Sequence, residues 1–552
     1  MKSQKYTSVF IGSLIVSLIL VALGFVPGYG EVSKNWRALL GTNFGWFYLL
    51  LVTLIVLVCG FFVLSPMGQI KLGEPDSKPE YSTGSWIAML FSAGMGIGLV
   101  FYGAAEPLSH FANKTPHAAP GSQQAMADSF QFTFFHWGIH AWAVYGIVAM
   151  ALAYFGFRKE EKYLLSVTLK PLFGKKTDGW LGYIIDIVTV VATVIGVATT
   201  LGFGAIQING GLSYLTDNAI PNSMEVRTVI IVVTTALFVL SALSGLGKGI
   251  KILSNLNMIL AIALLAIAIA VGPTVKIFDN MTESIGLYMQ NFFEMSFRTA
   301  AFNGGERAWI DTWTVFYWAW WISWSPFVGL FIARISKGRS IREFITVVLL
   351  IPTVLSFIWF SAFGTMANTV QQNGLENLTK LEDEQLLFGT FKHYPLGMLM
   401  SIIAIILIFT FFITSADSAT YVLAMLSEDG RLIPTNGKKV VWGVIVAGIA
   451  TVLLYAGDGL DALRNTLIII ALPFAVVVAL IVVALIVEVY HEKVQMGLSI
   501  SPDRYPEKGQ PFKSYESYES EDEAEKSIED EADTSAQQVK QGKKTSEPAK
   551  QE

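Results

Sequence analysis

The sequence predicts an all-α polytopic membrane protein with about twelve transmembrane helices. Of its 552 residues, 53% are hydrophobic and only 15% are charged, whereas about a quarter of a soluble chain is charged. A helix needs about 20 apolar residues to cross a bilayer. Because backbone polar groups in lipid must be paired within their own segment, we expect each long apolar run to be a helix. The runs lie at about 6–27, 43–65, 85–108, 127–155, 181–213, 227–247, 252–273, 313–336, 343–366, 396–426, 439–456 and 466–490.

The first run follows Lys2 and Lys5, as the core of a signal peptide does. It is longer than such a core and no small-residue cleavage site closes it, so we expect it to be the first spanning helix. Basic residues gather in the even-numbered connections, for example in ARISKGRSIRE after the eighth run. Cytoplasmic loops carry such an excess. Both termini are therefore expected in the cytoplasm.

The composition divides the chain into a transmembrane domain, residues 1–490, and a C-terminal tail, residues 491–552. The tail is polar and acidic, and contains few large aliphatic residues. Such a segment buries too little apolar surface to fold alone, so we expect it to be disordered and cytoplasmic. It is either a solvated extension or a regulatory segment that senses the membrane surface or the ionic medium.

Several function classes are disfavoured by what the sequence lacks. Cys59 is the one cysteine, so it forms no intrachain disulfide. The sequence has no phosphate-binding loop, no soluble segment of the size of an enzyme domain, and no nucleophile–base pair or metal-ligand set. We therefore expect neither an enzyme nor a resident cofactor, and no nucleic-acid partner.

Residues 313–327, WTVFYWAWWISWSPF, hold five of the chain's 14 tryptophans. At about 100° per residue, one helix face carries an aromatic strip about four turns long. An interfacial belt would occupy a single depth, which leaves a packed aromatic core or a box for a quaternary ammonium. Trimethylammonium has no N–H to donate, but aromatic faces attract its charge. The strip consists of Trp313, Tyr317, Trp320, Trp324, Phe327 and Phe331, with Trp321 beside it.

Three glycines alternate in the third run, FSAGMGIGLVFYGAAEPL: Gly94, Gly96 and Gly98. Each costs up to about 1 kcal/mol of helix stability relative to alanine. Small residues more often serve close helix packing. Alternate glycines do not form one packing face, however, and they favour a broken helix whose free carbonyl and N–H groups bind ions, as in secondary transporters.

Four segments together resemble the betaine/choline/carnitine transporter family: GMGIGLVFYGAAEP, HWGIHAWAVY, the tryptophan stretch and TSADSATYVLAML. The likeness covers nearly all of residues 1–490 and is greatest to sodium-coupled glycine betaine transporters of bacteria. It implies a LeuT-like fold in which helices 3–7 and 8–12 form two inverted five-helix repeats after two additional N-terminal helices. It also implies a homotrimer in the bacterial cell membrane.

The resemblance implies a substrate site at the centre of the bundle. The eighth helix would supply the box, the fourth helix would supply further aromatic residues of the pathway, and the glycine stretch would bind the substrate carboxylate through backbone N–H groups. The residues implied are Trp320, Trp321, Trp324 and Phe327, then Trp137, Trp142 and Tyr145, and Gly94, Met95, Gly96, Ile97 and Gly98.

The resemblance also implies a sodium ion between the third and tenth helices. Its ligands would be backbone carbonyls of the third and tenth helices and two neighbouring hydroxyls. Ser and Thr also bond back to the carbonyls of their own helix, which is the structural alternative. The residues are Ser92, Met95, Phe411, Thr414 and Ser415. A second sodium site would involve Ala93 and Thr193. Val197 stands where the family has a second threonine, so this site would be lost or altered unless Thr199 or Thr200 supplies the missing hydroxyl.

Charge near the glycine stretch bears on the substrate. Some choline transporters of the family have Asp where this chain has Gly98, and no acid lies between Ser92 and Ala105. A zwitterion is therefore favoured over a plain cation. We expect sodium-coupled uptake of glycine betaine, an osmoprotectant, by alternating access. Carnitine or choline transport, by proton coupling or exchange, is the alternative, and a membrane osmosensor that moves no substrate is a further one.

Other ionisable residues in the runs are candidates for function by default. Glu106 precedes Pro107, which favours a cap or loop pair at a helix end. Asp417 follows the Thr414–Ser415 pair and is expected to orient it or to pair with a neighbouring helix. His136 and His140 are one turn apart, a spacing that suits metal binding, but the sequence offers no further ligand beside them.

Overall fold

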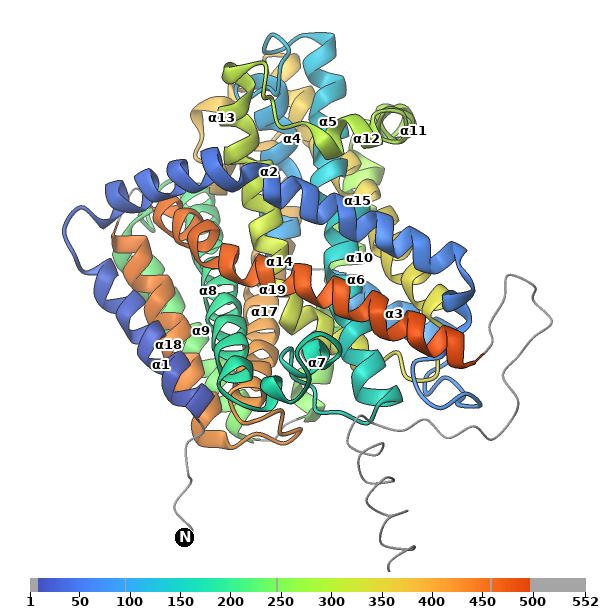
Figure 1. Ribbon diagram of the computed structural model, residues 1–552. Coiled ribbons are helices and arrows are strands. Elements are labelled where there is room, and N and C mark those ends of the chain that lie inside the picture. Colours follow the sequence, from blue (N-terminus) through green and yellow to red (C-terminus); the bar gives the residue numbers. More distant parts are fainter. Residues whose placement is uncertain (1–7, 95, 245–246, 457–458, 497–552) are drawn as a thin grey trace, which may run out of the picture.

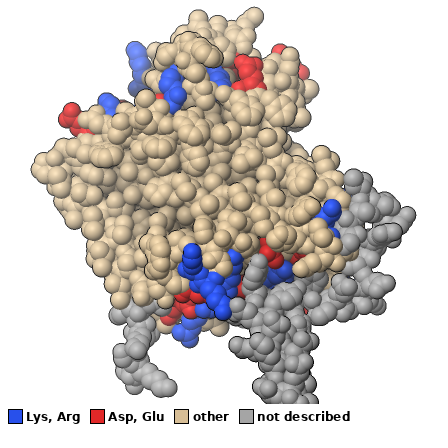
Figure 2. Space-filling model, in the orientation of Figure 1, with Lys and Arg blue, Asp and Glu red and all other residues tan. Residues whose placement is uncertain are grey.

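The computed structural model describes residues 8–94, 96–244, 247–456 and 459–496, and the regular elements within these ranges are all helices, with no strand. Ten helical stretches within them are long and apolar enough to cross a membrane. Charged side chains gather at the two ends of the face shown in Figure 2, and a broad uncharged belt separates them. The protein is thus a multi-pass membrane protein, as the composition predicts.

The helices follow one another without large irregular insertions (Figure 1). They are α1 (Ser8–Gly24), α2 (Tyr29–Leu64), η1 (Pro66–Gln69), α3 (Thr83–Gly94), α4 (Ile97–Ala112), α5 (Gln123–Trp137), α6 (Ile139–Ala153), η2 (Tyr154–Arg158), η3 (Val167–Leu169), α7 (Lys170–Phe173), η4 (Gly174–Asp178), α8 (Trp180–Leu215), α9 (Met224–Ser244), α10 (Gly247–Val271), α11 (Thr274–Gln290), α12 (Phe292–Phe297), α13 (Gly304–Thr312), α14 (Thr314–Arg334), α15 (Ile341–Gln372), η5 (Leu378–Lys380), η6 (Asp383–Gln385), α16 (Leu386–Phe391), α17 (Gly397–Leu426), α18 (Asn436–Tyr455) and α19 (Leu460–Gln495).

Every apolar run identified in the sequence coincides with a helix or a pair of helices. The first run corresponds to α1, which covers 17 described residues and ends at Gly24. The third run is divided between α3 and α4, so neither part is counted among the ten long stretches. The last helix continues past residue 490 to Gln495, and the acidic tail, residues 497–552, lies outside the described residues.

Two interruptions were not expected from the hydropathy. The run 127–155 was expected as one helix, but Gly138, with φ −94° and ψ −140°, separates α5 from α6. Trp313 was placed on the same helix as the rest of the tryptophan strip, but it caps α14 between α13 and α14. Apolar composition continues across the break at Gly138, so hydropathy does not mark it, whereas the polar helix α13 precedes the break at Trp313.

The helix α14 occupies the centre of the bundle and packs on α6, α8 and α19 (Figure 1). Its residues are almost all buried, which explains why it is rich in aromatic residues on every side. At the edge of the bundle α1 packs on α18 and α8. The helix α11 is seen end-on near the top of Figure 1, so it lies across the direction of the spanning helices.

A buried ion-pair network joins α19 to the end of α6. Arg158 of η2 pairs with Glu492, to which Tyr154 also donates a hydrogen bond. Lys159 pairs with Glu488 at 2.9 Å. All four charged side chains are buried, so each depends on its partner for compensation of its lost hydration.

We predict that Glu492→Ala lowers the free energy of unfolding by about 3–5 kcal/mol, because Arg158 would be left as a buried charge without its carboxylate. Thermal unfolding of the purified protein in detergent measures the change. The matched control is Lys162→Ala, whose pair with Asp429 is more than half exposed on both sides and is worth about 0–1 kcal/mol. Equal melting temperatures for the two variants would contradict the prediction.

Candidate functional site

A cavity of about 170 Å³ lies at the middle of the bundle between α4, α6, α14 and α17. The structure brings most of the predicted substrate residues to it. They are Gly96, Ile97 and Gly98 of the glycine stretch, Trp137, Trp142 and Tyr145, and Trp320, Trp321, Trp324 and Phe327. The predicted strip therefore faces a cavity, while its outer members Trp313 and Tyr317 lie among buried rings beyond it.

The rings form an angular wall. Trp320 and Trp321 lie nearly parallel, with ring centroids 5.0 Å apart and planes 10° apart. Trp137, the last residue of α5, stands nearly perpendicular to them, at 4.9 Å from Trp321 and 6.1 Å from Trp320. Tyr145 meets Trp321 edge-on at 5.9 Å. A cation placed against this wall lies within the about 6 Å over which aromatic faces attract it.

The indole N–H groups of the wall donate hydrogen bonds to acceptors of the protein. Trp320 donates to Thr200 Oγ1 at 3.1 Å, and Trp321 donates to the His136 carbonyl at 2.9 Å. Trp137 donates to Glu106 Oε2 at 2.7 Å. These bonds fix the ring orientations and leave aromatic surface, rather than hydrogen-bond donors, for a ligand.

The expected helix break is confirmed. The helix α3 ends at Gly94 and α4 begins at Ile97, with Gly96 extended at φ −159°. The first N–H groups of a helix have no partner within it, so we expect those of Ile97 and Gly98 to be available at the cavity, whereas the Leu99 N–H donates to the Gly96 carbonyl at 3.1 Å. Met95 lies outside the described residues, as do the side chains of Ser92 and Ala93.

Oxygen groups of α17 line the same cavity. Phe411, Thr414 and Ser415, which the resemblance gives as sodium ligands, all border it. The Thr414 hydroxyl donates to the Thr410 carbonyl at 3.0 Å, which is the back-bonding that serine and threonine commonly make in helices. It also accepts a bond from Asn257 Nδ2 at 3.1 Å.

Thr193 is placed differently from these residues. It is fully buried in α8, donates to the Thr189 carbonyl at 2.7 Å and is absent from the described lining of the cavity. Val197, one turn further along α8, is buried and offers no oxygen. Thr200 does reach the cavity, where its hydroxyl accepts from Trp320.

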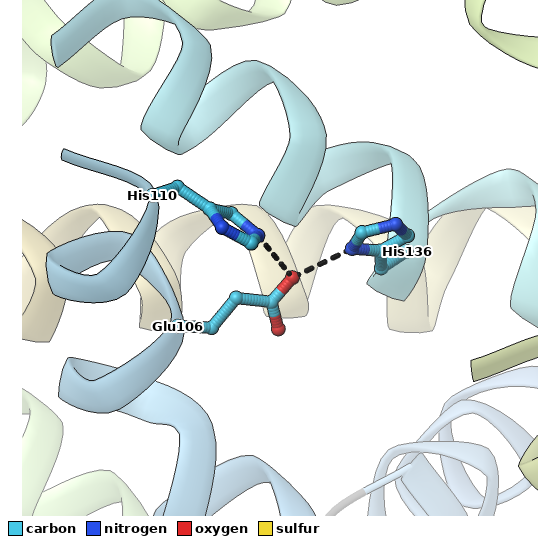
Figure 3. Close-up of side chains that lie close together, drawn as sticks. All are labelled: Glu106, His110 and His136. Carbon is cyan, nitrogen blue, oxygen red and sulfur yellow. Dashed lines mark hydrogen bonds and ion pairs between the residues drawn. The ribbon is translucent and has the colours of Figure 1, made fainter. Parts of the chain in front are cut away.

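The interpretation of Glu106 as a cap or loop pair at a helix end is wrong. Pro107 lies inside α4, and Glu106 is fully buried in the middle of the helix. It contacts His110 and His136, as Figure 3 shows. Asp417 of α17 accepts a bond from Ser241 of α9 at 2.9 Å, which confirms the predicted pairing with a neighbouring helix. His140 bonds to Ser296, so the two histidines of α5 and α6 have separate partners.

Several polar residues of the lining were not predicted. Asn257 is one of two amides, with Asn255, in the apolar run 252–273, which is the one signal that the sequence offers for it. The others are serines, which are common in spanning helices and carry little information alone. The missed polar residues are Ser254, Asn257, Ser356 and Ser418.

A second cavity of about 510 Å³ continues from the first toward the end of α14 at Arg334. The two share Phe327, Phe331 and Ser418. Toward the opposite end, Arg464 covers buried aromatic rings. It donates to the Tyr102 hydroxyl at 2.7 Å and lies over the Phe316 ring. The central cavity therefore leads toward the Arg334 end of the bundle.

Comparison with known proteins agrees with the cavity's chemistry. The family model described as BCCT, betaine/carnitine/choline family transporter, matches residues 8–494. The chain belongs to this family. The resemblance stated from the four sequence segments is thereby confirmed, and this transporter is a member over nearly the whole of its length.

Relatives of known name differ in the solute that they are named for. Glycine betaine transporter OpuD of Bacillus subtilis is 56% identical over 455 residues, 82% of this chain and 88% of the relative. An ectoine/hydroxyectoine transporter of Virgibacillus pantothenticus is 42% identical, covering 87% and 95%. A glycine betaine transporter of Acinetobacter baylyi is 41% identical, covering 86% and 72%.

We predict that Gly98→Ala weakens substrate uptake. A Cβ at this position would lie 2.6 Å from Trp320 Cη2 and 3.2 Å from Trp137 Cη2, so the two rings would have to move apart. Overpacking of this kind costs about 1–3 kcal/mol, so the glycine betaine concentration for half-maximal uptake should rise roughly tenfold. Gly448→Ala on α18, where a Cβ meets nothing within 4 Å, is the control. An unchanged concentration in Gly98→Ala would contradict the geometry.

Proposed function

We propose that this protein is a secondary active transporter that takes up glycine betaine with sodium by alternating access. The observation that carries the proposal is the wall of Trp137, Trp320 and Trp321, whose N–H groups are bound by the protein and whose rings border a central cavity. The names of two relatives that share 56% and 41% identity support the same substrate.

The zwitterion fits two features that border the same cavity, the aromatic wall and the start of α4. Its trimethylammonium has no N–H, so it gains from aromatic faces, at about 0.5–2 kcal/mol per ring. Its carboxylate suits the free N–H groups and positive dipole end of α4, which begins at Ile97. Gly98 supplies no acid, so a plain cation such as choline would lack a counter-charge in the glycine stretch.

Sodium would bind beside the substrate, between the glycine stretch and α17. Sodium prefers oxygen ligands, and the hydroxyls of Thr414 and Ser415 border the cavity together with Phe411. Ser92 and Met95 would contribute backbone carbonyls. A second site at Ala93 and Thr193 has less support, since Val197 replaces a hydroxyl-bearing residue. The protein needs no resident cofactor in this scheme.

Orientation and assembly complete the proposal. With both termini in the cytoplasm of a bacterial cell, the Arg334 end faces inward and the central cavity leads to the cytoplasm. The divided third run and the shorter α1 suit twelve spans, with two inverted LeuT-like repeats of five. One charge moving inward releases about 2.3 kcal/mol per 100 mV, which drives accumulation. We also propose a homotrimer and uptake that protects the cell against osmotic stress.

Flux into proteoliposomes tests the function. Uptake of labelled glycine betaine should require an inward sodium gradient and should be inhibited weakly by choline, carnitine and ectoine. Ectoine is included because a relative 42% identical is named for it. Proton-driven uptake, or exchange without a gradient, would instead support a carnitine or choline transporter. Ligand binding with no net flux would support a membrane osmosensor.

We predict that Trp320→Ala and Trp324→Ala each raise the dissociation constant for glycine betaine about tenfold or more, because each removes an aromatic face from the cavity. Isothermal titration of the purified variants measures this. Trp36→Ala is the control, since Trp36 on α2 is 54% exposed and is not among the residues that line the cavity. Wild-type affinity in both cavity variants would contradict the proposal that these rings bind the ammonium group.

We predict that Thr414→Ala with Ser415→Ala raises the sodium concentration for half-maximal uptake severalfold, because two oxygen ligands are lost. Sodium titration of uptake at saturating glycine betaine measures the effect. Thr451→Ala on α18 is the control, since that hydroxyl also bonds back to its own helix, at the Ala447 carbonyl, but lies outside the cavity. The same sodium requirement in the double variant and the control would exclude the site.

A further inference from the structure

Glu106 lies directly behind the aromatic wall and does not border the cavity. Its Oε2 accepts hydrogen bonds from Trp137 Nε1, at 2.7 Å, and from the Tyr317 hydroxyl. Its Oε1 contacts His136 Nδ1 at 2.7 Å and His110 Nε2 at 3.3 Å (Figure 3). One carboxylate thus connects α4, α5 and α14 behind the predicted box.

The surroundings of Glu106 suit an ionised carboxylate. Trp137 can only donate, and an ionised carboxylate can only accept. Tyr317 and the two histidines can each donate one further hydrogen, which satisfies both oxygens with four donors. Among the described residues, the ion-pair partners of Glu106 are His110 and His136, and no lysine or arginine pairs with it.

The contact geometry does not favour a metal ion in place of these hydrogen bonds. Glu106, His110 and His136 place one ligand atom each within 4.8 Å of one another. The Oε1–Nδ1 distance of 2.7 Å is the length of a charge-assisted hydrogen bond. His136 Nε2 also contacts the Thr314 hydroxyl at 3.0 Å, so that ring is fixed by protein groups on both nitrogens.

The two donors to Oε2 belong to the box or support it. The Trp137 ring faces Trp321 at 4.9 Å, and the Tyr317 ring stacks on Trp321 at 5.7 Å with planes 22° apart. Cation attraction depends on the negative face of the ring. A carboxylate that accepts from the indole N–H or the phenol O–H shifts electron density toward that ring. Its own negative charge also attracts a cation across the ring, with little screening by water.

We propose that Glu106 is a positioning residue that polarises the box: it orients Trp137 and Tyr317 and strengthens their attraction for a quaternary ammonium that it never touches. This inference rests on the proposed substrate class. It gives the site a full negative charge near the ammonium, although no acid is found among the described residues that line the cavity.

The test compares two ligands of the same shape. In 3,3-dimethylbutyrate a carbon replaces the nitrogen of glycine betaine, so the methyl groups and carboxylate are kept and the positive charge is lost. Competition binding gives the affinity ratio of the two ligands for the wild type, Glu106→Gln and Glu106→Asp. Glutamine retains the size and an acceptor oxygen but lacks the charge, whereas aspartate retains the charge.

We expect Glu106→Gln to lower the betaine-to-isostere affinity ratio about tenfold, within the energy that a desolvated cation–aromatic contact supplies. Glu106→Asp should recover part of the ratio. Asp186→Asn is the control, because Asp186 is another buried carboxylate, held by Ser166, and its loss should leave the ratio unchanged.

Each outcome separates the proposals. If Glu106→Gln weakens both ligands equally, or if the ratio stays at the wild-type value, Glu106 acts only in packing and the inference is overturned. If Glu106→Gln does not fold, Tyr317→Phe removes one donor and keeps the ring, and it should still lower the ratio; an unchanged ratio there overturns the inference. A wild-type protein that does not prefer glycine betaine contradicts the proposed function instead.

Discussion

The attraction between aromatic faces and a methylated cation that has no hydrogen to donate is the interaction on which the proposed substrate site depends. A hydrogen-bonding pocket cannot hold such a group, so the chain places Trp137, Trp320 and Trp321 around a buried cavity. Every one of these rings has its N–H bound elsewhere in the protein. The helix α14 can carry so many large side chains because it lies at the centre of the bundle, where other helices cover it.

The break between α3 and α4 joins the two parts of the proposed site. In the proposed site its N–H groups would bind the substrate carboxylate, and its carbonyls, with Thr414 and Ser415 of α17, would bind sodium. One irregular segment would therefore contribute to both proposed sites, and occupancy of one site would then favour occupancy of the other. The cavity leads toward the Arg334 end, while Arg464 and the rings around Tyr102 cover the opposite end.

The sequence predicts two kinds of feature: residues that repeat along the face of one helix, and residues that interrupt a helix. The spacing of the tryptophan strip placed Trp320, Trp324 and Phe327 on one face, and alternate glycines predicted the break; both features are present. The support of the rings was not predictable, because it comes from distant residues. Trp320 bonds to Thr200, 120 residues away, and Tyr317 bonds to Glu106, 211 residues away. The break at Gly138 was missed because apolar composition is continuous across it.

Binding of glycine betaine, dimethylglycine, sarcosine and glycine to the wild-type protein at fixed sodium tests the central claim most directly. These ligands keep the carboxylate and lose one methyl group at a time, and each loss adds an N–H group. The account predicts that affinity falls at every step, by a total of at least about 100-fold, because the aromatic wall offers no acceptor for the new donors. Equal or tighter binding of dimethylglycine or sarcosine would contradict it.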